Sequence, residues 1–192
     1  LSSPKIITDA YVPVGAISLN VQNTSGLKKG DTILIKRHAN QRWIDVLEMN
    51  AFGGQTEYLG WKPGERIIEW ERNLKEIDGN QLIFEVPLTN AIESEYGGGE
   101  VGKMEYPGRI SHIGIENLKL ISAYDTTNEK DEDHCWNAIS FEHAENAWVR
   151  QIEFEHFAGS AVAVYRSSRM ITVQDCISLH PVSEIGGQRR NT

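Results

Sequence analysis

An internal repeat in the second half of the chain is the feature that most limits how this sequence can fold. Residues 138–156 recur in type at 161–180, with offsets of 23 and 24. Residues 115–120 match 149–154 at an offset of 34, as expected if a loop is inserted at 124–137. A repeat of this length, built from short stretches of alternating apolar residues, indicates a solenoid.

Each copy predicts two short strands joined by a polar turn. We expect strands at 138–142 and 148–155 in one copy, and at 161–165 and 171–179 in the next. A unit of about 23 residues is too short for two strands and a crossover helix, but it fits one turn of a parallel β-helix. The columns expected are Ile115/Val149/Val173 and Leu118/Ile152/Cys176 in the interior, and the polar column Asn117/Gln151/Asp175 at a corner.

The first hundred residues lack this repeat and predict antiparallel strands instead. The β-branched stretch at 32–36 predicts a strand. The pair Asp78-Gly79 supplies the positive φ angles of a tight turn, so we expect a hairpin between 75–77 and 81–86. Residues 43–50 fit neither a helical nor a strand period, so a short helix and a strand both stay open.

The fold class expected is therefore all-β, with a parallel β-helix following an antiparallel subdomain. We divide the chain into first strands at 1–22, which could belong to the β-helix, an antiparallel β-rich subdomain at 23–100, and β-helix coils at 101–192. Right-handed is the usual hand of parallel connections. The sequence stops just after a repeat without a polar cap, so we expect a piece of a longer protein.

Composition excludes several classes of protein. A formal net charge of −8 argues against general nucleic-acid binding, which needs a positive surface. No apolar run is long enough to span a bilayer as a helix. The chain has two cysteines, Cys135 and Cys176. Because Cys176 falls in an apolar column, we expect a buried free thiol there.

The stretches GRISHIGIENLKLIS, DEDHCWNAISFEHAENAWVRQIEFEHF and PVSEIGGQRR resemble bacterial proteins of the pectin-lyase-like right-handed β-helix superfamily. The resemblance covers Arg109–Thr192. It implies an exported protein, secreted, periplasmic or on the cell surface, with a polysaccharide or oligosaccharide as partner. It leaves open a lyase acting by β-elimination, a glycoside hydrolase, and a non-catalytic glycan-binding or structural module. The oligomeric state is not indicated.

Histidines at a strand end carry the catalytic prediction. His156 and His180 fall in register one coil apart, where their rings could meet and transfer protons or bind sugar. Stacked polar corner residues are the structural alternative. By analogy with uronate lyases, which use an Arg or Lys base, we predict that Arg189 or Arg190 acts together with His180. A hydrolase would instead use a pair of carboxylates among Glu142, Glu153 and Glu155.

Other polar and aromatic residues are candidates for ligand contacts. The residues predicted to bind substrate are Arg150, Arg166, Arg169, His143 and Trp61. Ordinary surface arginines paired with glutamates, and a core tryptophan, are the alternatives. The acidic loop at 125–134 offers Asp131 and Asp133 as oxygen ligands for Ca²⁺, the one cofactor considered. A solvated acidic loop without metal is the alternative.

Overall fold

The structure is a computed structural model that describes residues 2–51, 60–187 and 189–190. The chain divides into two compact units, Leu1–Glu105 and Tyr106–Thr192, which are described separately. The first unit contains β1 (Ser2–Ile6), β2 (Tyr11–Val12), β3 (Ser18–Asn20), β4 (Thr32–Arg37), α1 (Gln41–Val46), β5 (Ile68–Asp78), β6 (Gln81–Phe84), β7 (Ile92–Glu93), η2 (Ser94–Tyr96) and β8 (Gly99–Lys103). The second contains β9 (Ile110–Ser111), β10 (Gly114–Ile121), β11 (Asn137–Phe141), β12 (Ala144–Glu155), β13 (Ser160–Val164), β14 (Arg169–Gln174) and β15 (Ile177–Leu179).

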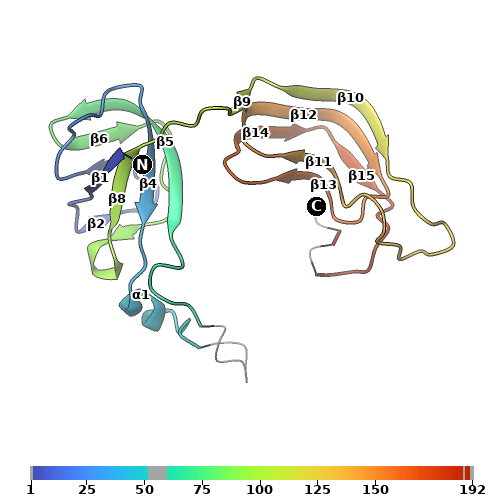
Figure 1. The fold of residues 1–192 in the computed structure, drawn as a ribbon, viewed down its shortest axis with the longest axis horizontal. Helices are drawn as coiled ribbons and strands as arrows, with labels where there is room; N and C mark the ends of the chain where they lie inside the picture. Colours follow the sequence, from blue (N-terminus) through green and yellow to red (C-terminus); the bar gives the residue numbers. More distant parts are fainter. Residues whose placement is uncertain (1, 52–59, 188, 191–192) are drawn as a thin grey trace. The chain divides into compact units, whose positions relative to one another are not determined.

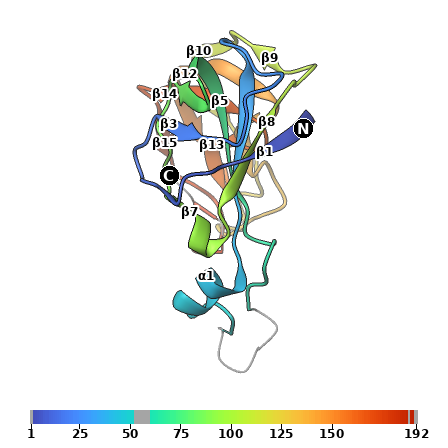
Figure 2. The ribbon, with the colours of Figure 1, turned by 90° about the vertical axis from the view of Figure 1, so that its left-hand side faces the viewer.

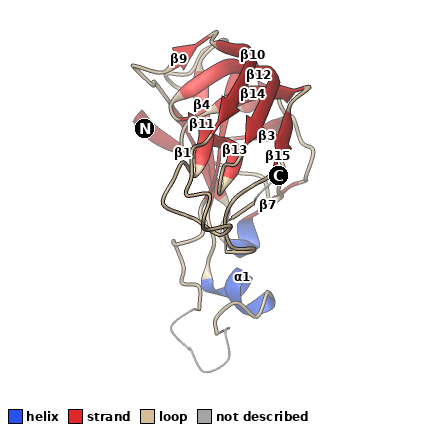
Figure 3. Ribbon diagram, turned by 90° about the vertical axis from the view of Figure 1, so that its right-hand side faces the viewer, coloured by secondary structure: helices blue, strands red, loops and turns tan. Residues whose placement is uncertain are grey.

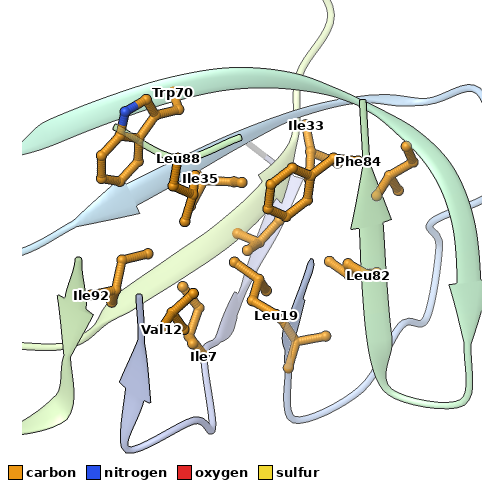
Figure 4. Packing of buried hydrophobic residues seen from close by; sticks show 13 residues of the cluster. Ile7, Val12, Leu19, Ile33, Ile35, Trp70, Leu82, Phe84, Leu88 and Ile92 are labelled. Atoms are coloured by element: carbon orange, nitrogen blue, oxygen red, sulfur yellow. The ribbon is translucent and has the colours of Figure 1, made fainter. Parts of the chain in front are cut away.

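The first unit is built on a six-stranded antiparallel sheet in the order β1-β8-β4-β5-β6-β3. Its strands alternate buried and exposed residues, as β4 shows most clearly. The side chains that point inward form one apolar cluster, most of which is shown in Figure 4. Its fully buried members include Leu19, Ile33, Ile35, Leu82, Phe84 and Ile92. This closed apolar core accounts for the independent compactness of the unit.

Several predictions for this unit are confirmed. The strand at 32–36 is β4. The expected hairpin forms, but its two turn residues are Gly79 and Asn80, because Asp78 belongs to β5 and pairs with Gln81. Of the two alternatives at 43–50, the short helix is closer, because α1 begins where the Asn40 side chain accepts a hydrogen bond from the Trp43 amide. Figure 2 shows α1 beyond the end of the sheet.

Residues 1–22 belong to the antiparallel unit and not to the parallel coils. β1 pairs antiparallel with β8, and β3 pairs antiparallel with β6. The short strand β2 pairs with β7. The sequence does not reveal this assignment because the partners β6, β7 and β8 lie some 60 to 100 residues further along the chain. Such long-range pairing leaves no local signal.

The second unit consists of parallel strands stacked in two sheets. β10, β12 and β14 form one sheet, which β9 and β15 join by pairing with β12, and β11 and β13 form the other. All of these pairings are parallel. Figures 1 and 3 show β10, β12 and β14 side by side. We call the three successive layers the first, second and third coils; they contain β9–β10, β11–β12 and β13–β15.

The strand registers confirm the offsets of the repeat. Ile115 pairs with Val149, and Val149 pairs with Val173. Ile139 pairs with Val162 in the other sheet. The offset of 34 results from the segment 122–136, which lies between β10 and β11. The polar stretch 144–146, expected as a turn between the two strands, belongs to β12, which begins at Ala144; the backbone still bends there, with a φ of 50° at Asn146.

Burial in the predicted interior columns depends on the coil. In the second coil Val149 and Ile152 are fully buried, whereas Leu118 in the first coil is 48% exposed and Val173 in the third is 50% exposed. The second coil has a neighbour on both sides, and each of the other two has a described neighbour on one side only. An opening of about 320 Å³ lies in the interior beside the third coil and includes Val162, Val173 and Cys176 in its lining.

The coils bend at columns of residues with left-handed backbone. The predicted corner column Asn117, Gln151 and Asp175 has φ angles of 59°, 55° and 52°. Three further columns share this conformation: His112/Asn146/Met170, His143/Ser167 and His156/His180. Non-glycine residues adopt it rarely, with Asn, Asp and His the most frequent. Four of the six histidines of the chain therefore lie at bends.

Both cysteines are free thiols, with Cys135 exposed and Cys176 half-buried. The Cys176 thiol lies 3.3 Å from the carbonyl oxygen of Gln174. The free thiol is thus confirmed, although its burial is only partial because the third coil is open on one side. No helix within the described residues has the length and apolarity needed to cross a membrane.

Candidate functional site

A row of four rings lies at the corner of the coils where β12 and β15 end. The ring centroids of His134 and Tyr124 are 6.0 Å apart, those of Tyr124 and His156 5.0 Å, and those of His156 and His180 6.3 Å. We call His134, Tyr124, His156 and His180 the ring row. His180 is exposed and the other three are half-buried, so each ring is partly accessible to solvent.

The predicted pair His156 and His180 is brought together at stacked bends, with φ angles of 70° and 50°. Nδ1 of His156 lies 3.0 Å from the carbonyl oxygen of His180. Because a carbonyl oxygen only accepts hydrogen bonds, Nδ1 of His156 is the donor. In the neutral ring this assigns the proton to Nδ1 and leaves Nε2 as an acceptor or a base.

His134 fixes the inserted segment at this corner. Its Nε2 lies 3.2 Å from the carbonyl oxygen of Asp131 and 3.0 Å from that of Val182, so Nε2 donates. Its Nδ1 is 2.8 Å from Oγ of Ser122, which is buried and occupies the first-coil position of the His156 column. The imidazole thus joins the end of β10, the inserted segment and the residues after β15, and it holds Tyr124 against His156.

The acidic segment at 125–134 is an ordered loop closed by its own carboxylates. Asp131 is 8% exposed, and its oxygens accept the backbone amides of Asp125 and Asp133 at 2.9 Å and 3.0 Å. These hydrogen bonds keep the pKa of Asp131 below its usual value. Among the described residues no group of three or more His, Cys, Asp or Glu is placed to hold a metal ion. The oxygens proposed for Ca²⁺ are therefore partly used by the loop itself.

The side chains of Arg189 and Arg190 bind partners other than the predicted His180. The guanidinium of Arg189 is paired with both carboxylate oxygens of Glu132 and lies 5.4 Å above the Trp136 ring. This ion pair keeps the pKa of Glu132 below its usual value. Arg190 donates to the hydroxyl and the carbonyl oxygen of Ser183. Both side chains tie the segment after β15 to the loop and to the coils, and their predicted action with His180 stays a prediction.

A second cluster lies at the opposite end of β12. The rings of Tyr106 and His143 stack with centroids 5.4 Å apart, and the Tyr106 hydroxyl is hydrogen-bonded to Nδ1 of His143. The guanidinium carbon of Arg109 lies 4.7 Å above the Tyr106 ring. Arg169 pairs with Glu145 at 2.7 Å. Of the residues predicted to bind substrate, His143 and Arg166 meet here, since the amide of His143 donates to the carbonyl of Arg166.

Charged side chains on the outer face of the β10-β12-β14 sheet are paired across the coils. Lys119 binds Glu153 and Glu155 at 2.6 Å and 2.9 Å. Arg150 pairs with Glu116 at 2.8 Å instead of with Glu153 or Glu155. The hydrogen bond from Lys119 keeps the pKa of Glu155 below its usual value. A glycosidase acid needs the opposite, a raised pKa, so Glu155 lacks the property expected of such an acid, and a carboxylate pair among Glu142, Glu153 and Glu155 stays a prediction.

Trp61, the remaining candidate, lies in the first unit. Its ring stacks on Trp43 with centroids 5.6 Å apart, and the guanidinium of Arg66 lies 4.9 Å above it. Arg37 lies over the Trp43 ring at 4.1 Å. Neighbouring side chains of the same unit therefore already occupy ring surface of Trp61 that a sugar would need.

Sequence reasoning missed Tyr124 and His134, which complete the ring row. Both lie in the inserted segment, outside the repeat, so no column position marked them. A usable signal was present nonetheless: Ser122 occupies the column position of His156 and His180, which places the start of the insertion at the same corner.

No family model matches the chain, and no curated protein sequence matches it. Three of the solved structures that match the chain are phage tailspikes. The tailspike gp61 of Pseudomonas phage phi297 has a TM-score of 0.48 at 10% identity, covering 90% of this chain and 33% of that one. The tailspike gp49 from Pseudomonas phage LKA1 has a TM-score of 0.39 at 9% identity, covering 91% of this chain and 29% of that one. The tailspike Gp54 of Acinetobacter baumannii bacteriophage AP22 was solved in complex with A. baumannii capsular saccharide. It has a TM-score of 0.43 at 11% identity, covering 90% of this chain and 33% of that one. The chain spans about a third of each tailspike's length.

Proposed function

We propose that this chain is part of an exported right-handed parallel β-helix protein that binds a polysaccharide along the ring row. The observation that carries the proposal is the continuous series of accessible rings from His134 through Tyr124 and His156 to His180. The parallel registers of the two sheets support the β-helix. The hand follows the general preference for right-handed parallel connections.

The chemistry of the ring row suits a sugar polymer. A sugar presents an apolar C–H face and a rim of hydroxyl groups. Tyr124 and the imidazoles combine flat rings with polar atoms, which is the mixture that orients such ligands. Nε2 of His156 accepts a hydrogen bond from a sugar hydroxyl. The corner columns repeat at roughly 4.8 Å per coil, so successive contacts lie along one line.

The bends permit a test that separates binding from folding. His180 has a φ of 50°, where glycine is free of the steric penalty of roughly 1–2 kcal/mol that other residues bear. We expect His180→Gly and His156→Gly to weaken polysaccharide binding at least tenfold without lowering the melting temperature. His112→Gly, at another left-handed bend with a φ of 58°, is the matched control and should bind normally.

Binding is measured by biolayer interferometry with immobilised Acinetobacter baumannii capsular polysaccharide, polygalacturonate and dextran. The proposal is supported if the parent protein binds at least one of these polymers and the His180→Gly variant does not bind it. Binding that is unchanged in both His180→Gly and His156→Gly, or no binding to any polymer by the parent protein, contradicts it.

Cleavage of a uronate polymer by β-elimination is a second candidate function. The observation that favours it is the hydrogen bond from Nδ1 of His156 to the carbonyl oxygen of His180, which leaves Nε2 of the neutral ring as a base beside the exposed ring of His180. Removal of the C5 proton by Nε2, with departure of the C4 oxygen as the leaving group, creates a C4–C5 double bond that absorbs ultraviolet light. Polygalacturonate and alginate incubated with the protein are followed by absorbance. A rise that is absent in His156→Gly supports elimination, and no rise with either polymer contradicts it.

A further inference from the structure

We infer that the corner at the opposite end of β12 is a separate binding site for a carboxylated sugar, formed by His143 and Arg166. The proposal stands independently of the ring row. A site on this corner is built from the β11–β12 turn and the β13–β14 turn, which stack on each other. The evidence is the fixed orientation of the His143 ring and, in the adjacent turn, an arginine without a side-chain partner among the described residues.

The His143 ring is held in place before any ligand arrives. Its backbone is a left-handed bend with a φ of 54°. Tyr106 stacks on the ring at 5.4 Å with an interplanar angle of 27°, and its hydroxyl is hydrogen-bonded to Nδ1. Arg109, whose side chain is 6% exposed, backs Tyr106. A ring fixed in this way loses little conformational entropy on binding.

The protonation of His143 matches an anionic ligand. When the Tyr106 hydroxyl donates to Nδ1, the neutral imidazole carries its proton on Nε2, which then donates to an oxygen of the ligand. His143 is exposed, so part of its surface meets solvent. The ring thus offers a surface for a sugar and a donor for its carboxylate.

Arg166 supplies the charge. Its carbonyl accepts the His143 amide at 3.1 Å, which places the two residues in adjacent turns. Within the described residues of this unit, Arg166 is the one arginine whose guanidinium has no hydrogen bond, ion pair or ring contact. The others bind Glu116, Glu132, Glu145 or Ser183. A planar guanidinium binds a carboxylate through two parallel hydrogen bonds.

The site is too far from the ring row for one small sugar to touch both. β12 has 12 residues and connects the two corners. The bends at Asn146 and Gln151 shorten the distance between its ends. At roughly 3.3 Å per residue the stretch 152–155 alone still covers about 13 Å, which is more than the length of one monosaccharide. A monosaccharide therefore reports on one corner only, and this makes the two proposals separable by experiment.

The test uses sodium glucuronate and glucose as probes, with the ¹H–¹³C signals of the histidine rings followed by NMR on the full chain. We expect glucuronate to shift the His143 signal at millimolar concentration and glucose to shift it at least fivefold less. Arg166→Gln should abolish the glucuronate shift. Arg150→Gln, which alters an exposed arginine already paired with Glu116, is the matched control and should leave the shift unchanged.

Equal shifts with both sugars, or a glucuronate shift that survives Arg166→Gln, would overturn the proposal. His143→Gly adds a second check, because it removes the ring at a left-handed position that glycine tolerates; it should lower glucuronate affinity without lowering the melting temperature. His180→Gly should leave the His143 shift intact. Loss of polymer binding in His180→Gly with a normal His143 response would show that the two corners act separately.

Discussion

The two units differ in which residues occupy the backbone positions with a positive φ angle. In the first unit most positions with a positive φ are glycines, for example Gly30 and Gly79. In the second unit most are residues with side chains, for example Asn117, Gln151 and His156. Glycine turns a chain without steric penalty, whereas a side chain at a left-handed bend is mildly strained. The left-handed bends of the second unit are therefore mildly strained, and they place columns of side chains at its corners.

Core truncation should have its largest effect in the first unit. Phe84 is 1% exposed in the closed apolar cluster. We expect Phe84→Ala to lower the free energy of unfolding by about 3–5 kcal/mol. Urea denaturation followed by the fluorescence of Trp70, a member of the same cluster, measures the loss. Val86→Ala, at a side chain that is 42% exposed, should change stability by less than about 1 kcal/mol.

In the second unit the effect of truncation should depend on the coil. Ile152 and Leu118 occupy one interior column but are 1% and 48% exposed. We expect Ile152→Ala to lower the free energy of unfolding by about 2–5 kcal/mol and Leu118→Ala by about 1 kcal/mol. Urea denaturation monitored through Trp148 compares the two variants. Equal losses would contradict the difference in burial between the coils.

Acid should loosen the second unit before the first. Side-chain and backbone hydrogen bonds hold the pKa values of six carboxylates there below their usual values, at Glu116, Asp125, Asp131, Glu132, Glu145 and Glu155. In the first unit the pKa of Asp31 is held below its usual value, because the hydrogen bond from Lys103 and the backbone amide of Lys28 outweigh the effect of burial. A carboxylate with a lowered folded-state pKa stabilises the fold above its unfolded pKa, near 4, and this contribution disappears as pH falls through the folded value.

Hydrogen exchange measured at pH 7 and at about pH 3 therefore should show a larger loss of protection in β10–β15 than in β1–β8, after correction for the intrinsic exchange rate. Glu132→Gln should shrink this loss because it removes one of the titrating ion pairs. An equal loss of protection in the two units would contradict the electrostatic difference between them.

The smallest expected effect tests the bends directly. Gln151→Gly should raise the free energy of unfolding by up to about 1 kcal/mol, because it relieves a left-handed residue with a φ of 55°. Gly79→Ala, at a φ of 57° in the first unit, should lower it by about 1 kcal/mol. Thermal unfolding of both variants shows whether the free energy of unfolding rises in Gln151→Gly and falls in Gly79→Ala. Glu153→Gly, two residues from Gln151 and outside the bends, is expected to destabilise.

The repeat made the second unit predictable from sequence, because each column position is sampled several times. Ile115, Val149 and Val173 fall in register as the offsets required. The first unit offered one local signal of comparable strength, the Asp78-Gly79 pair of the hairpin. The pairing of β1 with β8 joins residues far apart in the chain, and no local pattern specifies it.

The part of the candidate site that lies within the repeat was predictable from the sequence, and the part that lies in the insertion was not. His156 and His180 share a column, and their meeting follows from the repeat. The positions of Tyr124 and His134 depend on how the insertion folds back, through hydrogen bonds from His134 to carbonyls at Asp131 and Val182. Such contacts use backbone atoms that every residue has, so the sequence does not mark the partner. The partner of Arg189 is a side chain, the carboxylate of Glu132, but it lies 57 residues away and no local pattern connects the two.

The clasp between the inserted segment and the residues after β15 also affects the order in which the coils open. Arg189 binds Glu132, Lys130 binds Glu184, and His134 binds the Val182 carbonyl. The third coil lies between these contacts in the chain, so we expect them to slow its separation from β12. We therefore expect fraying of the third coil to be coupled to detachment of the inserted segment, which lies between β10 and β11.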